Sequence, residues 1–454
     1  MLTQAPPKIK LPPKAPKIIN AATPTELDTL TNNSITNNDC IPDHIPIKET
    51  IGKIGLMWPR TYSIHHPAKD LLNIYATKGC PVECGKNWSK NQIIQAILHG
   101  PHKSAQSKAA MDALHEETKI KVAHNFAKIV KFKDIKHNLP PNLKISPVAC
   151  IPHKSKSFRV ILDLSFKLKT PKETFLSVNE TTQKLAPPEA MVQLGQCIQR
   201  IIHTMEKNYD LTNPFKFCKL DIKDGFWRMV VNESDAWNFC YVLPDKTKSN
   251  INIDDTQIVV PHSLQMGWCE SPPFFCAGSE TARDTIKNLL DQNTILQKHK
   301  FEHYMLPQTI NTHQSPKNVA EALEVFVDDF IGATNDIRQK NLEKYSRAML
   351  HGIHSIFPPD EITQHPGGDS ISVKKLKQGE GRWEYKKEIL GWNFNGKDFT
   401  IQLPYEKCTK IIRLIKQTIK QKSVPLKQFQ KLQANYNTLH WGCQAEQDYS
   451  PRYK

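Results

Sequence analysis

Two adjacent acids, Asp328 and Asp329, lie inside an apolar segment, FVDDF at residues 326–330. Apolar and β-branched flanks predict a buried β-hairpin with the acids at its tight turn, where aspartate tolerates unusual backbone angles. Two negative charges at an apolar site are unfavourable unless a cation neutralises them. The segment therefore indicates a metal-binding turn or an ordinary Asp-Asp turn, and by itself it does not separate the two.

A third acid, Asp221, ends the apolar segment FKFCKLD at residues 215–221. An acid at a strand end can share a metal ion with a neighbouring hairpin turn, so Asp221, Asp328 and Asp329 form one candidate cluster. Carboxylate oxygens suit hard divalent ions, normally Mg²⁺ with Mn²⁺ as a substitute. Two such ions, about 4 Å apart, activate an attacking oxygen and neutralise a leaving pyrophosphate. We expect Asp224, in the same turn, to be solvated or structural.

The elements that must position these acids read as short strands and helices in mixed order. This order predicts an α+β fold and not a regularly alternating parallel sheet. Helices are predicted at residues 91–99, 109–132, 274–290, 338–354 and 405–420. Strands are predicted at residues 158–164, 215–222, 237–243, 256–260, 325–330, 371–376, 388–394 and 399–403.

The net charge of +16, from 61 basic and 45 acidic residues, favours a polyanion partner such as nucleic acid. Residues 371–454 hold 17 basic and seven acidic residues, so the excess lies in a segment with folding signals. No apolar run is long enough to span a membrane, and the N-terminus lacks the apolar core of a secretion signal. Eleven cysteines follow no repeating frame, which suits reduced thiols. We expect an intracellular protein of the cytoplasm or nucleus, not a secreted one.

The chain divides into four predicted parts. Residues 1–50, rich first in Pro and Lys and then in Thr and Asn, read as a disordered tail. Residues 51–140 form a helical N-terminal extension, which ends near a proline-containing LPPNL segment. Residues 141–403 contain the short strands and all three acids, and residues 404–454 follow them.

With these motifs in place, residues 141–403 resemble the fingers and palm of a retrotransposon reverse transcriptase. The resemblance implies a right-hand polymerase fold with a partial thumb in residues 404–454. It implies RNA-directed DNA polymerase activity, although Phe326 stands where the family's hairpin usually has tyrosine. The motifs are FRVILDLSF (158–166), KLDIKDGF (219–226), LQMGWCESPPFF (264–275), FVDDF (326–330), SVKKLKQ (372–378) and EILGWNF (388–394).

The resemblance also implies roles for single residues. Asp221 and Asp328 would bind both metal ions, and Asp329 would assist them. Phe226, five residues after Asp221, would be the aromatic steric gate that excludes a ribose 2′-hydroxyl, although an ordinary core aromatic is the alternative. Arg159 would clamp the triphosphate. Lys154 would clamp it too, with Lys156 as the alternative for that lysine.

Further contacts follow from the later motifs. Gly267 would let the backbone approach the template-primer closely. Met266 stands where the family has a polar residue that touches the incoming sugar, because Gln265 lies one position early, and this departure puts nucleotide affinity and fidelity in doubt. Lys374, or its neighbour Lys375, would be the general acid for pyrophosphate, although either is equally a candidate for a solvated side chain.

The primer-grip hairpin contains Trp392, and the helix that opens the partial thumb contains Lys410 and Lys416. These three residues would contact the template-primer, the two lysines through phosphates and without reading sequence. Residues Cys80, Cys84, His99 and His102 lie close enough in sequence for a zinc site. Their spacing is atypical, so ordinary structural roles are the favoured alternative.

Two functions from different classes remain. The first is a polymerase that uses an RNA template, a DNA or RNA primer and deoxynucleoside triphosphates, together with other retroelement proteins. The second is a catalytically silent nucleic-acid-binding relic or domesticated relative. A viral RNA polymerase is less favoured, because those enzymes usually have glycine before the paired acids and because Phe226 disfavours ribonucleotides.

Overall fold

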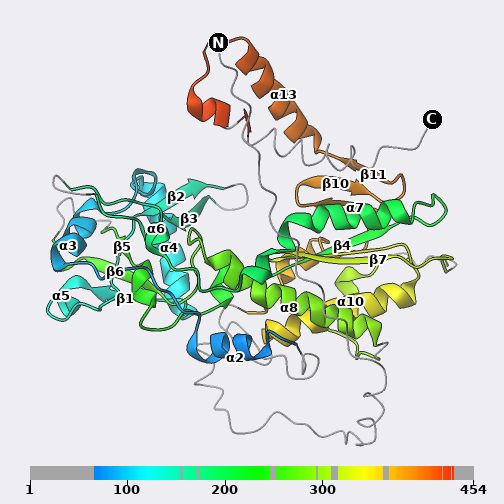
Figure 1. Cartoon of the computed structure of the whole chain (residues 1–454), viewed down its shortest axis with the longest axis horizontal. Coiled ribbons are helices and arrows are strands. Elements are labelled where there is room, and N and C mark those ends of the chain that lie inside the picture. Colours follow the sequence, from blue (N-terminus) through cyan, green and yellow to red (C-terminus); the bar gives the residue numbers. More distant parts are fainter. Residues whose placement is uncertain are drawn as a thin grey trace, which may run out of the picture. The chain divides into compact units, whose positions relative to one another are not determined.

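The computed structural model describes residues 66–153, 157–170, 174–245, 252–292, 295–307, 315–360, 368–421, 423–430 and 432–433. The predicted tail, residues 1–50, and the predicted contact Lys154 lie outside the described residues. Helices alternate irregularly with short antiparallel sheets, which confirms the α+β class (Figure 1). Within the described ranges no helix is both long and apolar enough to cross a membrane.

The central sheet holds the acids. It contains strands β4 (Lys216–Asp221), β8 (Asp329–Thr334) and β7 (Glu321–Phe326), paired antiparallel in that order. Successive side chains of a strand point to opposite faces, and each face here packs on helices. Helix α7 (Cys197–Lys207) lies on one side, and helices α8 (Ser271–Asp291) and α10 (Gln339–Ile356) lie on the other (Figure 1).

Alternation along β4 decides which side chains share a face. Cys218 is buried against α10, where its thiol lies 3.5 Å from the sulfur of Met349. Phe217 instead belongs to the apolar cluster that includes residues of α7. Because the period of a strand is two, Lys219 and Asp221 continue the row that begins with Phe217.

Helices α8 and α10 pack closely through a glycine. A Cβ added to Gly352 of α10 would lie 2.3 Å from Cγ1 of Ile286 on α8. Pro272 and Pro273 occupy the first turn of α8, where a missing backbone N–H leaves no bond unmade. Both predicted helices are therefore confirmed, and together they form a firm support under the central sheet.

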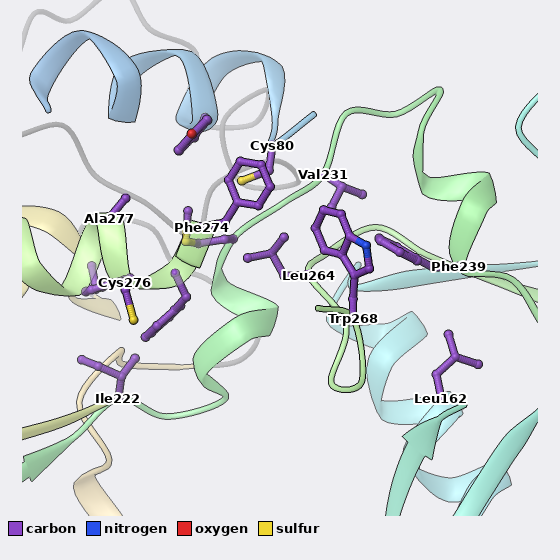
Figure 2. Packing of buried hydrophobic residues seen from close by; sticks show 14 of the residues in the cluster. Cys80, Leu162, Ile222, Val231, Phe239, Leu264, Trp268, Phe274, Cys276 and Ala277 are labelled. Atoms are coloured by element: carbon purple, nitrogen blue, oxygen red, sulfur yellow. The ribbon is translucent and has the colours of Figure 1, made fainter. Parts of the chain in front are cut away.

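The rest of the described chain includes three N-terminal helices and two small sheets, whose strands come from residues 127–162 and 241–261. Trp268 stacks on Phe274 with ring centroids 5.7 Å apart. Phe239 packs edge-on against Trp268, with ring centroids 5.1 Å apart (Figure 2). The helices are α2 (Lys69–Lys78), α3 (Lys90–His99) and α4 (Lys108–Ala123). One sheet has the order β1 (Ala127–Lys131), β6 (Gln257–Pro261), β5 (Tyr241–Leu243), and the other pairs β2 (Val148–Pro152) with β3 (Phe158–Leu162).

A third small sheet follows the central one in sequence and packs beside β4. Phe394 of this sheet meets Phe217 edge-on, with ring centroids 5.6 Å apart. Its strands are β9 (Lys386–Ile389), β10 (Trp392–Asn395) and β11 (Thr400–Gln402), and helix α13 (Tyr405–Ile419) comes next. Short helical segments elsewhere are α5 (Phe132–Ile135), α6 (Val178–Thr181), α9 (Glu302–Met305) and α12 (Val373–Lys377).

Three predicted elements are wrong. The strand predicted over residues 388–394 is a hairpin of β9 and β10, because the chain turns at Leu390 and Gly391, which both have positive φ. The helix predicted over residues 109–132 ends at Ala123, because Asn125 adopts a left-handed conformation and β1 then pairs with β6. The strand predicted over residues 371–376 is mostly helix α12, since only Ile371 makes a β-bridge. Lysine and leucine favour helix in the segment that follows this bridge. In addition, β5 covers only the end of the strand predicted over residues 237–243.

Candidate active site

Asp328 and Asp329 lie where strands β7 and β8 meet. Phe326 pairs with Asp329 across the hairpin, so Val327 and Asp328 form a two-residue turn. Val327 has a φ of +57°, a left-handed conformation that is unfavourable for a β-branched side chain. The paired strands on both sides hold this backbone in place. The predicted hairpin with the acids at its turn is confirmed.

Strand pairing brings Asp221 to the same place. In the β4–β8 ladder Asp221 lies directly opposite Asp329. The backbone N–H of Ile222 donates to the carbonyl oxygen of Asp328 at 2.9 Å, which ties the end of β4 to the turn. Three acids from two distant segments therefore converge at one end of the strands of the central sheet.

Two lysines contact the clustered carboxylates. Nζ of Lys375, on helix α12, lies 2.6 Å from Oδ1 of Asp221. Nζ of Lys219, on strand β4, lies 3.6 Å from Oδ1 of Asp329 and 3.7 Å from Oε2 of Glu380. Of the described residues, none forms an ion pair with Asp328.

The electrostatics of the cluster follow from burial and charge crowding. Burial, and then the charges of Asp329 and Asp221, raise the pKa of Asp328 to about 6. Burial also raises the pKa of Asp221, although the hydrogen bond and the charge of Lys375 oppose that rise. Desolvation alone would lower the pKa of Lys375, but its bond to Asp221 holds that pKa above the ordinary value. A cation at Asp328 would relieve this crowding.

A cavity of about 560 Å³ opens beside the acids, a size typical of small-molecule sites. Its wall comes from the central sheet, strand β3 and the segment after β4. Lys375 lines the cavity, whereas neither Lys374 nor Gly267 is among its residues. The predicted site residues that line it are Asp221, Asp328, Asp329, Arg159, Phe226 and Met266.

The segment after β4 positions the predicted gate. Asp224 and Gly225 both have positive φ, which turns the chain sharply before Phe226. The Phe226 ring meets Phe275 of α8 edge-on, with centroids 5.6 Å apart. Behind it the buried guanidinium of Arg228 donates to carbonyl oxygens of Lys223, Gly368 and Asp369 at 2.8–3.0 Å. Phe226, the predicted gate, is therefore half-buried on a turn that the Arg228 hydrogen bonds hold in place.

The segment before α8 departs from what the resemblance implies for Gly267. Gly267 has a φ of +109°, and an added Cβ would lie 2.4 Å from the carbonyl oxygen of Leu162 in β3. Packing against β3 therefore requires this glycine, with no template-primer contact needed to explain it. Met266 is half-buried at the cavity wall, while Nε2 of Gln265 donates to the carbonyl oxygen of Ser263 at 2.7 Å.

The residues predicted to contact the template-primer lie away from the cavity wall. Trp392 opens strand β10 and is half-buried. Lys410 and Lys416 are exposed on helix α13, the helix predicted to begin the partial thumb. The structure does not bring these three residues to the acids.

Sequence reasoning missed several cavity residues. Lys121 and Glu117 of α4 form an ion pair at 3.1 Å, and Lys121 also lies 3.9 Å from the ring centre of Trp227. Their four-residue spacing on a helix was visible in the sequence, but nothing local pointed to the cavity. Lys219 lines the neighbouring groove and not this cavity, and it was equally visible two residues before Asp221, on the same face of the strand.

The acids fit a divalent ion as a partial ligand set. Across the described ranges, no three or more His, Cys, Asp or Glu side chains are grouped so as to hold a metal ion. Magnesium, however, commonly takes one or two carboxylates and completes its shell with water and substrate phosphates. Asp221 and Asp328 supply such oxygens at a single cavity, while Lys219 engages Asp329.

Three of the four residues considered for zinc have structural surroundings that involve no metal. Cys80 lies in the same buried apolar cluster as Val231 and Phe274 (Figure 2). Burial raises the pKa of the Cys84 thiol to about 11, and its sulfur lies 3.5 Å from the hydroxyl oxygen of Thr182. His102 caps a short 3-10 turn through its ring nitrogen.

Comparison with known proteins gives only distant similarity. No family model matches the sequence, and no curated protein matches it. The chain is similar to the foamy viral protease-reverse transcriptase in complex with dsDNA, with a TM-score of 0.40, 16% identity, and 86% of this chain and 61% of that one covered. For the foamy viral protease-reverse transcriptase dRH in complex with ds DNA, the TM-score is 0.39 at 15% identity, covering 91% and 55%. The chain thus spans little more than half of these proteins, and similarity at this level carries no argument about activity.

Proposed function

We propose that the chain is an RNA-directed DNA polymerase that adds deoxynucleotides to a primer 3′-hydroxyl. One observation carries this proposal: Asp221, Asp328 and Asp329 converge at a cavity that Arg159 and Phe226 also line. Paired acids, a cation and an aromatic ring at one small-molecule-sized cavity suit the recognition of a nucleoside triphosphate.

The proposed reaction is an in-line transfer. The primer 3′-hydroxyl would lose its proton to solvent water as its oxygen attacks the α-phosphorus of the nucleotide. A new phosphodiester bond forms, and the bond from that phosphorus to the bridging oxygen breaks to release pyrophosphate. Divalent ions held by Asp221 and Asp328 would supply Lewis-acid stabilisation of the phosphate oxygens. Arg159 lines the cavity from β3 and would hold the triphosphate, and protonated Lys375, which lines the same cavity, would donate a proton to the departing pyrophosphate.

Selection of deoxynucleotides would depend on Phe226. Its ring is held edge-on by Phe275, and the turn that carries it is braced by Arg228. A 2′-hydroxyl on the sugar would meet this fixed aromatic surface. An RNA template and a DNA or RNA primer would be held by phosphate contacts, to which the exposed lysines of α13 would contribute.

A second function is supported by a specific observation. Lys375 already neutralises Asp221, and Lys219 contacts Asp329, so the cluster has internal cations. In addition, Met266 stands where the resembling family has a polar residue that touches the incoming sugar. A nucleic-acid-binding protein that no longer catalyses extension would retain these features.

A primer-extension assay on an RNA template separates the two functions. The full chain is supplied with Mg²⁺ or Mn²⁺ and either deoxy- or ribonucleotides, and Asp328→Asn serves as the matched variant. The polymerase proposal expects metal-dependent deoxynucleotide addition that is lost in Asp328→Asn, with unchanged template-primer binding. Salt-sensitive binding by a folded protein that never extends the primer would favour the second function.

A further inference from the structure

Lys219 is an unusual residue in its strand. It lies between buried residues of β4, on the same face as Phe217 and Asp221. Its side chain is charged and is nevertheless only 19% exposed. An ammonium group is placed at such a position when a charge partner is present. Its partners are Asp329 on one side, at 3.6 Å, and Glu380 on the other, at 3.7 Å.

Backbone pairing also fixes the position of Lys375 beside Asp221. Ile371 forms a β-bridge with Ile222, and the N–H of Ser372 donates to the carbonyl oxygen of Asp221 at 2.9 Å. Helix α12 begins directly after this pairing, so Lys375 is brought over the Asp221 carboxylate. The resulting Nζ–Oδ1 distance of 2.6 Å is that of a charge-assisted hydrogen bond.

The two lysines neutralise negative charges that strand pairing brings together. Asp221 and Asp329 lie directly opposite in the β4–β8 ladder, an arrangement that is destabilising for like charges. Each of these acids has one lysine, and Asp328 between them has none among the described residues. With Glu380 included, four carboxylates and two ammonium groups leave a formal net charge of −2 at the cluster.

We infer that Lys219 and Lys375 are internal counter-cations that hold the carboxylate cluster together without metal, and that Lys375 competes with divalent ions for Asp221. The inference rests on the metal-binding role proposed above for Asp221 and Asp328. The roles of the two lysines are unequal. Lys219 keeps Glu380 as a partner when Asp329 turns away, whereas Lys375 must leave Asp221 before an ion binds that carboxylate oxygen.

The direct test measures Mn²⁺ binding to the full chain without nucleotide or nucleic acid. The electron paramagnetic resonance signal of free Mn²⁺ monitors how much of the ion is bound. Lys375→Met should bind Mn²⁺ about threefold to tenfold more tightly than the unchanged protein, because a partly exposed ion pair no longer competes. Lys375→Arg retains the charge and should keep the original affinity. Lys219→Met should tighten binding less than Lys375→Met does.

A matched control separates local competition from a general change in charge. Lys386 lines the neighbouring groove that Lys219 and Lys375 also line, and its side chain is exposed on β9. Lys386→Met removes the same charge without touching the carboxylates, so its Mn²⁺ affinity should be unchanged. Equal tightening in Lys386→Met and Lys375→Met would overturn the inference.

Thermal unfolding gives a second readout that does not depend on activity. With EDTA, Lys375→Met should unfold at a lower temperature than the unchanged protein, and saturating Mn²⁺ should raise its midpoint by a larger increment. A folded Lys375→Met protein with unchanged or weaker Mn²⁺ affinity would overturn the inference, even if primer extension is observed. If the Mn²⁺ affinities and unfolding midpoints change as expected but no primer is extended, only the polymerase proposal is rejected.

Discussion

Asp328→Asn should make the metal-free protein more stable while removing catalysis. The folded protein raises the pKa of Asp328 to about 6 from its ordinary value of 3.8, so the charged carboxylate is unfavourable in the folded state. The unfavourable contribution is small below the ordinary pKa, grows as the pH rises towards 6, and is complete above it. Asparagine has nearly the same shape and carries no charge at any pH.

The size of the gain follows from the pKa difference. About two units correspond to roughly 3 kcal/mol at pH 8, and the partial exposure of Asp328 reduces the expected gain to about 1–3 kcal/mol. At pH 4.5 the same linkage leaves only about a third of that gain. Urea unfolding of both proteins in EDTA, at the two pH values, measures the difference in the free energy of unfolding.

Three results would refute this reasoning. Asp328→Asn would be no more stable than the unchanged protein at pH 8, or its gain would be the same at both pH values. Alternatively, Asp328→Asn would extend a primer as well as the unchanged protein does. The first two would show that charge crowding at the turn is absent, and the third that the carboxylate is not needed for catalysis.

Three further substitutions test other parts of the site. Phe226→Ala should weaken discrimination against ribonucleotides by on the order of tenfold to a hundredfold, measured by single-nucleotide extension; unchanged discrimination would remove its gate role. Gly267→Ala should lower the free energy of unfolding, measured in urea, by about 2–4 kcal/mol, because position 267 has a positive φ and the added Cβ meets the Leu162 carbonyl oxygen. An unchanged free energy of unfolding would show that strand β3 moves away to make room for the Cβ. Arg228→Met should cost about 2–4 kcal/mol by the same measurement, because three carbonyl oxygens lose a charged donor, and a smaller loss would mean that water replaces the guanidinium.

The central elements could be predicted because local signals and tertiary context agree there. The FVDDF hairpin has apolar flanks and turn-tolerant acids, and helix α8 has prolines at its start, so each pattern is complete within a short window. Residues 371–376 behave differently: Ile371 and Ser372 join the end of β4, while the lysines after them are free to form a helix. Local sequence does not reveal a two-residue pairing with a segment so far away.

The lysine contacts were hidden for the same reason. Which of Lys374 and Lys375 reaches Asp221 depends on whether the segment is a strand or a helix, and the strand prediction was wrong. Lys219 reads as an interruption in an apolar strand until Asp329 is known to lie diagonally across from it. Long-range strand register, and not residue type, therefore decided the part of the site that could not be predicted.

Gly352 has a consequence for how this chain can vary. Because an added Cβ would come within 2.3 Å of Ile286, a larger residue at position 352 requires a smaller one at position 286. The two positions, one on each of the helices beneath the central sheet, are therefore expected to change together. Relatives that carry alanine at 352 should carry alanine at 286, because valine would keep the Cγ1 atom that the added Cβ meets. A relative with alanine beside an unchanged isoleucine should have its two helices spaced farther apart.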